Sequence, residues 1–249
     1  QDLDVLIFFF FFMDSLTATL AWSRMAPVQC VTWGHPDTTG SPFIDYFLSS
    51  ELLETPDADS HYTERLVRLP LLATYFERPS AQSKIKNHQS SLHTYLCPQT
   101  LFKFHPDFDE VLAGILSRDP KAEIVLLEGR APHWTNRLKQ KFEKTLPGGS
   151  SRVSFLPAMP RAEFMNLLAN ADVILDPLHF GGGHTTYEAL AVGTPVITLP
   201  GGFLRSRITQ ALYRKMGFTE LIVSSPEHYI DTAVRLGTDQ SERTRVSAR

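Results

Sequence analysis

Short apolar runs alternate with amphipathic stretches along most of the chain, and this alternation predicts the fold class. The runs with the length and composition of buried strands are Val5–Phe10, Val28–Thr32, Ile44–Leu48, Glu123–Leu127, Val153–Phe155, Val173–Leu175, Val196–Thr198 and Leu221–Val223. The helical patterns between the later runs are Asp107–Ser117, His133–Lys144, Arg161–Asn170, Thr186–Ala191, Phe203–Met216 and Pro226–Leu236. Because each helix returns the chain for another parallel strand, we expect a doubly wound α/β fold.

One polar segment interrupts this pattern and predicts how the chain divides. Residues 77–93 are rich in Ser, Gln and Lys and have almost no apolar periodicity. We expect a linker there, with a partial N-terminal lobe at 1–76 and a C-terminal lobe at 94–237. Residues 238–249 are polar as well, and we expect this tail to be frayed.

The N-terminus carries a strongly apolar run, Val5–Met13, after Gln1, Asp2 and Asp4. The run is too short to cross a bilayer, which takes about 20 residues. A secretory signal would carry basic residues before its apolar core, and here the residues are acidic. We therefore expect a buried parallel strand. Because the chain begins on Gln1, we also expect it to be a piece of a longer protein.

Composition and charge exclude several classes. The chain has 249 residues, of which 43% are hydrophobic and 20% are charged, so it is not intrinsically disordered. A net charge of -3 gives no general attraction to nucleic acid or to an anionic membrane, and we expect neither as a partner. Cys30 and Cys97 provide no disulfide framework and no zinc-finger spacing. Reduced thiols in a cytoplasmic protein are the expectation.

The segment Ala171–Pro195 combines a buried strand, a glycine-rich loop and the start of a helix. Gly181–Gly183 allow the backbone to approach a ligand closely, and a helix N-terminus offers N–H groups to an anion. Three side-chain donors follow at the same point: His184, Thr185 and Thr186. Glu188, one turn later, can accept hydrogen bonds from ribose hydroxyls. The pattern predicts a phosphate or diphosphate site, and the alternative is a glycine-rich turn before a capped helix.

A second candidate is Lys103, which follows Gln99 and precedes the helix start at Pro106. This places it at a strand-to-helix crossing, at the carboxyl edge of the sheet, where ligands bind in open α/β folds. An ammonium group there would stabilise the charge that grows on a departing diphosphate.

Metal binding has weaker support. The Asp-x-Asp triplets at 2–4, 57–59 and 107–109 are explained by a strand start, a polar loop and a helix start. His179 and His184 have no third ligand at a plausible spacing along the chain. We expect no metal and no cofactor.

Several motifs agree with one known family and occur in its order from about Asp2 to Asp239. They are APVQCVTWGHPDTTG (26–40), IDYF (44–47), CPQTLFKFHPDFD (97–109), GHTT (183–186), AVGTPVITLPG (191–201), PGGFLRSR (200–207) and LGTD (236–239). Together they resemble the O-linked N-acetylglucosamine transferase and SPINDLY family, and the bacterial members in particular.

The resemblance implies a GT-B fold, with two Rossmann-like lobes and a nucleotide sugar in the cleft between them. It also implies inverting, metal-independent transfer of GlcNAc from UDP-GlcNAc to Ser or Thr hydroxyls of a protein or peptide. One alternative is a family member that uses another UDP-hexose or an Asn acceptor. A further alternative is a UDP-sugar-binding protein without transferase activity.

Site residues follow from the same resemblance. The stretch that holds the UDP diphosphate matches Gly183, His184, Thr185 and Thr186. Lys103 matches the lysine that neutralises the departing diphosphate, and Gln99 matches a polar contact beside it.

The nucleoside end of the site is implied in the same way. Arg161, after Met159, matches a lysine that lies over the uracil, and Glu188 matches the acid that binds ribose. Phe164 stands where some members have a uracil-facing histidine. His35 is a candidate cleft residue that could act in catalysis, and no general base is identified.

The chain departs from the family on the acceptor side. Phe8–Phe12 replaces a polar turn that follows the first strand, and the upstream part of the first lobe and the C-terminal crossing helix are expected to be missing. Because transfer requires a positioned acceptor, we expect this chain to bind nucleotide better than it transfers sugar, and it could be inactive alone.

Overall fold

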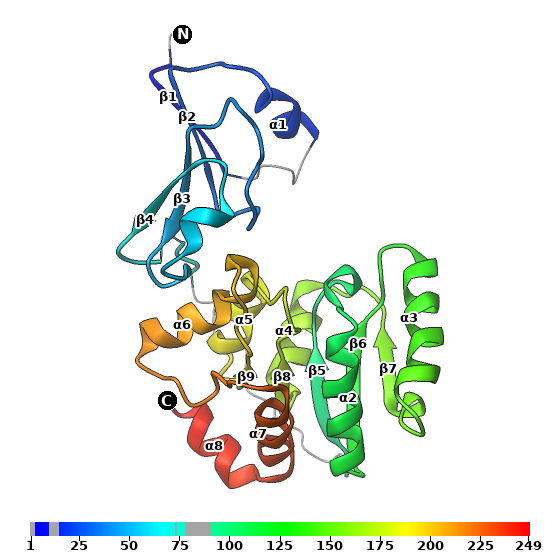
Figure 1. Cartoon of the computed structure of the whole chain (residues 1–249). Helices are drawn as coiled ribbons and strands as arrows, with labels where there is room; N and C mark the ends of the chain where they lie inside the picture. The colour runs from blue at the N-terminus through cyan, green and yellow to red at the C-terminus, as the bar shows by residue number, and fades with distance from the viewer. Residues whose placement is uncertain (1–2, 10–14, 73, 78–90) are drawn as a thin grey trace. The chain divides into compact units, whose positions relative to one another are not determined.

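The computed structural model describes residues 3–9, 15–72, 74–77 and 91–249, and its elements are drawn in Figure 1. The chain forms two compact units. The first is Gln1–Tyr75 together with Gly201–Lys215, and the second is Phe76–Pro200 together with Met216–Arg249. This division differs from the expected lobes at 1–76 and 94–237, because residues 201–215 join the first unit. Most of the expected linker at 77–93 lies outside the described residues.

The first unit contains a parallel sheet with the strand order β1-β2-β3-β4. Its elements are β1 (Val5–Phe8), α1 (Ser15–Leu20), β2 (Val28–Thr32), β3 (Tyr46–Ser50), a 3-10 turn at Ala58–His61 and β4 (Arg65–Leu69). The parallel strand expected near the N-terminus is confirmed, but its burial is not. Val5 and Ile7 are 52% and 38% exposed, since β1 is at the edge of this sheet.

The segment that joins the first unit from far along the chain does so through its apolar side chains. It consists of a 3-10 turn at Leu204–Ser206 and of α6 (Ile208–Met216). Leu204 and Ala211 belong to the same buried cluster as Phe47 and Leu53. In addition, Arg207 Nε donates to the carbonyl of Leu53 at 2.7 Å. The predicted helix at Phe203–Met216 is therefore present from Ile208, and it packs in a different core from the one expected.

The second unit contains a parallel sheet with the order β7-β6-β5-β8-β9. Its strands are β5 (His93–Cys97), β6 (Ala122–Leu127), β7 (Val153–Leu156), β8 (Val173–Leu175) and β9 (Val196–Ile197). The chain runs outward from β5 to β7 and then returns to β8 on the other side of β5. Adjacent loops diverge at such a point, which is where ligands bind in open α/β sheets. The predicted strand at Leu221–Val223 is reduced to one bridge, between Thr198 and Ile222.

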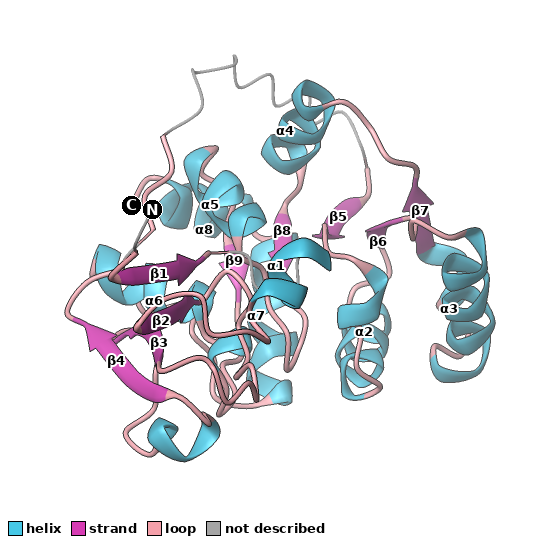
Figure 2. Cartoon of the chain, turned by 90° about the horizontal axis from the view of Figure 1, so that it is seen from above, coloured by secondary structure: helices cyan, strands magenta, loops and turns pink. Residues whose placement is uncertain are grey.

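Helices cover both faces of this second sheet. They are α2 (Asp107–Arg118), α3 (Pro132–Thr145), α4 (Arg161–Asn170), α5 (His184–Ala191) and α7 (Pro226–Thr238), with 3-10 turns at Leu101–Lys103 and Ser150–Arg152. In Figure 2, α4 and α5 lie on one side of β5 and β8, and α2 and α7 lie on the other. The α/β class with parallel sheets is thus confirmed in both units.

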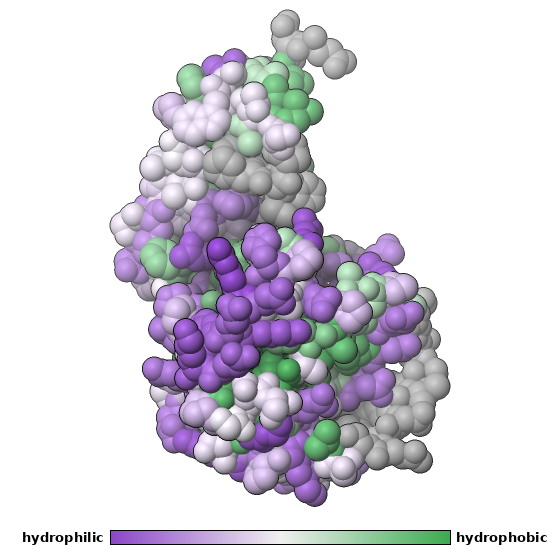
Figure 3. All heavy atoms as spheres, turned by 90° about the vertical axis from the view of Figure 1, so that its right-hand side faces the viewer, coloured by the Kyte–Doolittle hydropathy of each residue, from purple (hydrophilic) through white to green (hydrophobic). Residues whose placement is uncertain are grey.

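Amphipathic spacing explains why these helices pack as they do. In α2 the side chains of Phe108, Val111, Leu112 and Ile115 are buried, at the spacing of one helix face. In α3 only Thr135, Leu138 and Phe142 are buried, and hydrophilic residues cover much of the molecular face drawn in Figure 3. None of the helices among the described residues has the length and hydrophobicity that a membrane-spanning segment needs.

The C-terminal tail forms a helix, and the expectation that 238–249 is frayed was wrong. Helix α8 spans Gln240–Ser247 and is capped by Asp239, whose Oδ1 accepts from the backbone N–H groups of Ser241 and Glu242 at 2.8 and 3.0 Å. Arg243 is buried and lies 3.1 Å from the carboxylate of Asp172. The N-cap and the buried ion pair stabilise α8. Neither contact requires apolar residues at helical spacing, so the expected sequence pattern of a packed helix is absent.

Candidate functional site

The candidate site lies in the second unit, where two loops leave the sheet at the switch point between β5 and β8. The loop after β5 carries Gln99 and Lys103, and the loop after β8 carries the glycines and leads into α5. Gln99 Nε2 donates to Thr185 Oγ1 at 2.5 Å, and Lys103 Nζ donates to Gln99 Oε1 at 2.8 Å. Three residues predicted from the sequence are thus brought together, although they come from loops about eighty positions apart.

The ammonium group of Lys103 is positioned by neutral hydrogen-bond acceptors, so its positive charge stays available to an anion. Its ammonium also donates to the carbonyl of Gly181 at 2.9 Å and lies 4.5 Å from the centroid of the Phe180 ring. These acceptors are neutral, so hydrogen bonding positions the group without cancelling its charge. Burial lowers the pKa of Lys103 from its ordinary value, and the nearby carboxylate of Asp176 opposes that shift.

Asp176 shapes the glycine loop, and the sequence reasoning did not assign it a role. Its Oδ1 accepts from the N–H of Gly182 at 2.6 Å, and its Oδ2 accepts from the hydroxyl of Thr198 at 2.8 Å. A Cβ on Gly181 would lie 2.8 Å from the Asp176 carboxylate, so this position has room only for glycine. An acidic residue at a strand end, followed shortly by glycines, was the available signal.

The start of α5 has the features expected of an anion site. Gly183 precedes the helix and has no side chain that could cap it. The first N–H groups of α5 therefore have no side-chain cap, and they lie at the positive end of the helix dipole. His184 is exposed there. Thr186 is only 2% exposed, and its hydroxyl is directed toward Gly182, where an added Cβ would lie within 2.4 Å of it. Its predicted part in holding the diphosphate stays a prediction.

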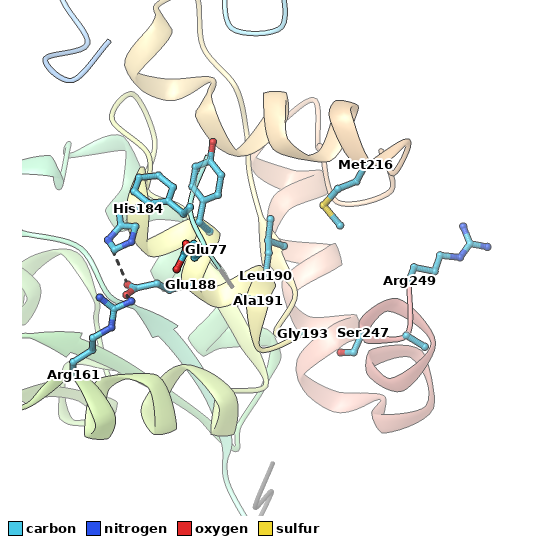
Figure 4. A pocket seen from close by; sticks show the side chains of 13 residues that line it. Glu77, Arg161, His184, Glu188, Leu190, Ala191, Gly193, Met216, Ser247 and Arg249 are labelled. Carbon is cyan, nitrogen blue, oxygen red and sulfur yellow. Dashed lines mark ion pairs between the residues drawn. The ribbon is translucent and has the colours of Figure 1, made fainter. Parts of the chain in front are cut away.

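A cavity of about 520 Å³ beside this helix start brings together the residues predicted for the nucleoside (Figure 4). Glu188 is buried, and its Oε1 lies 3.1 Å from Arg161. Its Oε2 lies 4.0 Å from His184 Nδ1. In Figure 4 the side chains of Arg161 and His184 both reach toward Glu188. Phe76, which was not predicted, lines the same cavity and packs on His184 with the ring centroids 4.4 Å apart.

The remaining predicted residues are less closely tied to this cluster. Met159 is half-buried in the segment before α4. His35 belongs to the first unit, where burial lowers its pKa and the charge of Asp37 acts in the opposite direction. Of the phenylalanine run, Phe8 is buried in the core of the first unit, whereas residues 10–12 lie outside the described part of the chain.

In two of the three Asp-x-Asp triplets, one aspartate forms an ion pair with a basic side chain. Asp59 pairs with Arg68 at 2.5 Å, and the buried Asp109 pairs with Lys141 at 2.9 Å. Asp107 is different, because it lies 2.8 Å from His179 and also next to His105. Of the two histidines considered for a metal site, His179 thus lies in a group with His105 and Asp107, and His184 does not belong to that group. The neighbours of His179 come from another loop, and spacing along the sequence could not show them.

The chain is similar in sequence to known proteins. A model of the glycosyl transferase family 41 matches residues 89–249. A probable UDP-N-acetylglucosamine–peptide N-acetylglucosaminyltransferase SPINDLY of Hordeum vulgare is 32% identical over 236 residues, which cover 91% of this chain and 25% of that protein. A UDP-glucose:protein N-beta-glucosyltransferase of Actinobacillus pleuropneumoniae is 27% identical over 237 residues, which cover 93% of this chain and 38% of that protein.

A solved structure agrees with the sequence matches. The structure of an O-GlcNAc transferase mutant from Thermobaculum terrenum superimposes with a TM-score of 0.83 and 31% identity. The match covers 98% of this chain and 47% of that one. The fold is therefore of the GT-B glycosyltransferase type. The chain spans between a quarter and about half of the length of these matched proteins.

Proposed function

This chain belongs to glycosyl transferase family 41, and from that premise we propose that it binds UDP-GlcNAc and transfers GlcNAc to Ser or Thr hydroxyls of a protein. The observation that carries the proposal is Lys103, a half-buried cation held by Gln99 and Gly181 next to the uncapped start of α5. The N-acetylglucosaminyltransferase names of the SPINDLY relatives and the Thermobaculum terrenum protein support the choice of sugar.

In this proposal the protein supplies the positive charge that the leaving group needs. Negative charge grows on the diphosphate as its bond to the sugar breaks. Fixed donors aimed at that charge act strongly in a partly buried site, because little water competes with them. The ammonium of Lys103 and the N–H groups at the start of α5 would fill this role, so the reaction would require no metal ion and no cofactor besides the donor substrate.

The nucleoside would occupy the cavity beside α5. The buried carboxylate of Glu188 can accept hydrogen bonds from ribose hydroxyls. The exposed guanidinium of Arg161 is planar and can stack on a base, a contact that a lysine would make only as a point charge. Phe76 and Tyr187 pack edge to face, with their ring centroids 4.7 Å apart, and add an aromatic wall.

A second candidate is transfer of glucose from UDP-glucose to an Asn side chain. The Actinobacillus pleuropneumoniae relative, whose name states UDP-glucose and protein N-glucosylation, matches 93% of this chain. Both candidates use the same diphosphate contacts, so the arrangement of Lys103 and α5 does not distinguish them.

Incubation with radiolabelled UDP-GlcNAc or UDP-glucose tests the proposal. Peptides that contain Ser, Thr and Asn would serve as acceptors, and mass spectrometry would locate the sugar. The proposal predicts GlcNAc on Ser or Thr. Glucose on Asn would replace it with the second candidate. If calorimetry shows that the same preparation binds UDP but labels no peptide with either donor, transfer by this chain is contradicted and nucleotide binding alone remains.

A further inference from the structure

Two histidines and an aspartate form an exposed cluster outside the candidate donor site. His179 Nε2 lies 2.8 Å from Asp107 Oδ2, and His105 Nδ1 lies 3.2 Å from Asp107 Oδ1. The two imidazole rings meet edge to face with their centroids 4.5 Å apart. Each of the three side chains is about half exposed, so the cluster can be reached from solvent.

The donor set matches the chemistry of a borderline divalent metal. Imidazole nitrogen and carboxylate oxygen are the ligands that Zn²⁺ takes besides thiolate, at about 2.0–2.2 Å. Tetrahedral ligands at that distance lie about 3.3 Å from one another. With one ligand atom from each residue, the three atoms here all lie within 4.8 Å of one another. His179 Nε2 is 2.8 Å from one carboxylate oxygen of Asp107, and His105 Nδ1 is 3.2 Å from the other. Because the three side chains are exposed, rotation about their side-chain bonds can shorten the remaining distances to those of a tetrahedral site.

We propose that His105, Asp107 and His179 bind a divalent transition-metal ion, with Zn²⁺ the best fit. Three protein ligands leave one tetrahedral position for water. The site is separate from the donor contacts, because neither Lys103 nor His184 is among its ligands. The proposal therefore does not depend on the proposed transferase activity.

The ligands come from the same two loops that form the donor site. His105 and Asp107 lie after β5, two and four residues beyond Lys103, and His179 lies after β8, two residues before Gly181. The loops already touch where Phe102 meets Phe180, with their ring centroids 5.9 Å apart, and where Lys103 donates to Gly181. A metal bound to both loops would cross-link them. Because only the folded chain brings the three ligands together, the ion would also stabilise the fold.

Zn²⁺ titration by calorimetry, together with thermal unfolding at neutral pH, tests this site. The main variant is His179→Asn. His179 has a φ of 69°, a left-handed conformation that asparagine tolerates, so the exchange removes the imidazole without forcing the loop to change. The matched control is His228→Asn, an exposed histidine at the start of α7.

Wild type and His228→Asn should each bind one Zn²⁺ and unfold at a higher temperature when it is present. His179→Asn should bind at least about tenfold more weakly, a change of about 1.4 kcal/mol, and lose most of the thermal shift. Asp107→Asn, on the exposed first turn of α2, should behave in the same way and provides a second test. Zn²⁺ affinity equal to wild type in both cluster variants, or reduced equally in His228→Asn, would overturn the site.

Discussion

At the scale of single residues, Lys103 has the most demanding environment of the candidate site. Its ammonium is positioned by Gln99 and Gly181 and lies over Phe180, and burial lowers its pKa. Burial removes water from the group and favours its neutral form, whereas a bound diphosphate would favour the charged form. UDP binding and protonation of Lys103 should therefore be coupled.

This coupling predicts that UDP binding weakens at alkaline pH. The charged lysine, present below its folded pKa, binds the diphosphate, and affinity is lost as the pH rises through that pKa, which lies below the ordinary 10.5. Titrations of UDP across the alkaline range would measure this. Lys103→Arg is the control, because arginine stays charged throughout. Identical alkaline profiles in the two proteins would show that Lys103 does not titrate in the site.

Gln99, Lys103 and Thr185 were proposed as site residues from the sequence, and the structure brings their side chains into contact. Their part in binding a diphosphate stays a prediction. The roles of Phe76 and Phe180 could not be predicted, because an aromatic ring acquires its neighbours only when distant loops meet. The same holds for His105 beside His179.

At the scale of elements, helix α8 is held by polar contacts. Arg243 pairs with the buried Asp172 at 3.1 Å, and its Nη1 also donates to the carbonyls of Leu236 and Gly237 at 2.6 Å. These carbonyls belong to the last turn of α7, where no intrahelical donor is available. One side chain thus joins α8 to α7 and to the residue before β8.

Arg243→Ala should therefore destabilise the chain by about 3 kcal/mol, because it removes the cation that pairs with the buried carboxylate of Asp172. Arg245→Ala is the matched control on the same helix. Arg245 is 43% exposed and pairs with Glu220 and Glu242 at the surface, so its loss should cost far less stability than the loss of Arg243. Urea unfolding would measure both, and equal effects of the two substitutions would contradict the anchoring role of Arg243.

Element prediction failed where polar residues lie inside a strand. β5 (His93–Cys97) was not among the predicted strands, and its first residue, His93, was assigned to the linker. In the structure the ring of His93 lies 2.7 Å from Asp119, and the hydroxyl of Tyr95 donates to the same carboxylate at 2.8 Å. Pairing of this kind allows a polar strand at the centre of a sheet, and apolar patterning cannot reveal it.

At the scale of the whole molecule, local patterns predicted the helices and strands better than they predicted the units. The helix near 203–216 was recognised, but its core partners, Phe47 and Leu53, lie more than 150 positions earlier. Membership of a unit depends on such long-range packing, which has no signature in the local sequence. The α/β class and the family followed more directly, because each rests on many positions at once.

We propose that the second unit binds UDP through Lys103 and the start of α5 without a metal ion. Calorimetric titration of UDP in a buffer with EDTA tests it most directly, with wild type, Lys103→Ala and Lys139→Ala, an exposed lysine on α3, as the three proteins. Wild type and Lys139→Ala should bind equally, and Lys103→Ala should bind about 10- to 150-fold more weakly, a loss of roughly 1.5–3 kcal/mol. Equal affinity of Lys103→Ala and wild type, or binding that appears only when Mg²⁺ or Mn²⁺ is added, would contradict it.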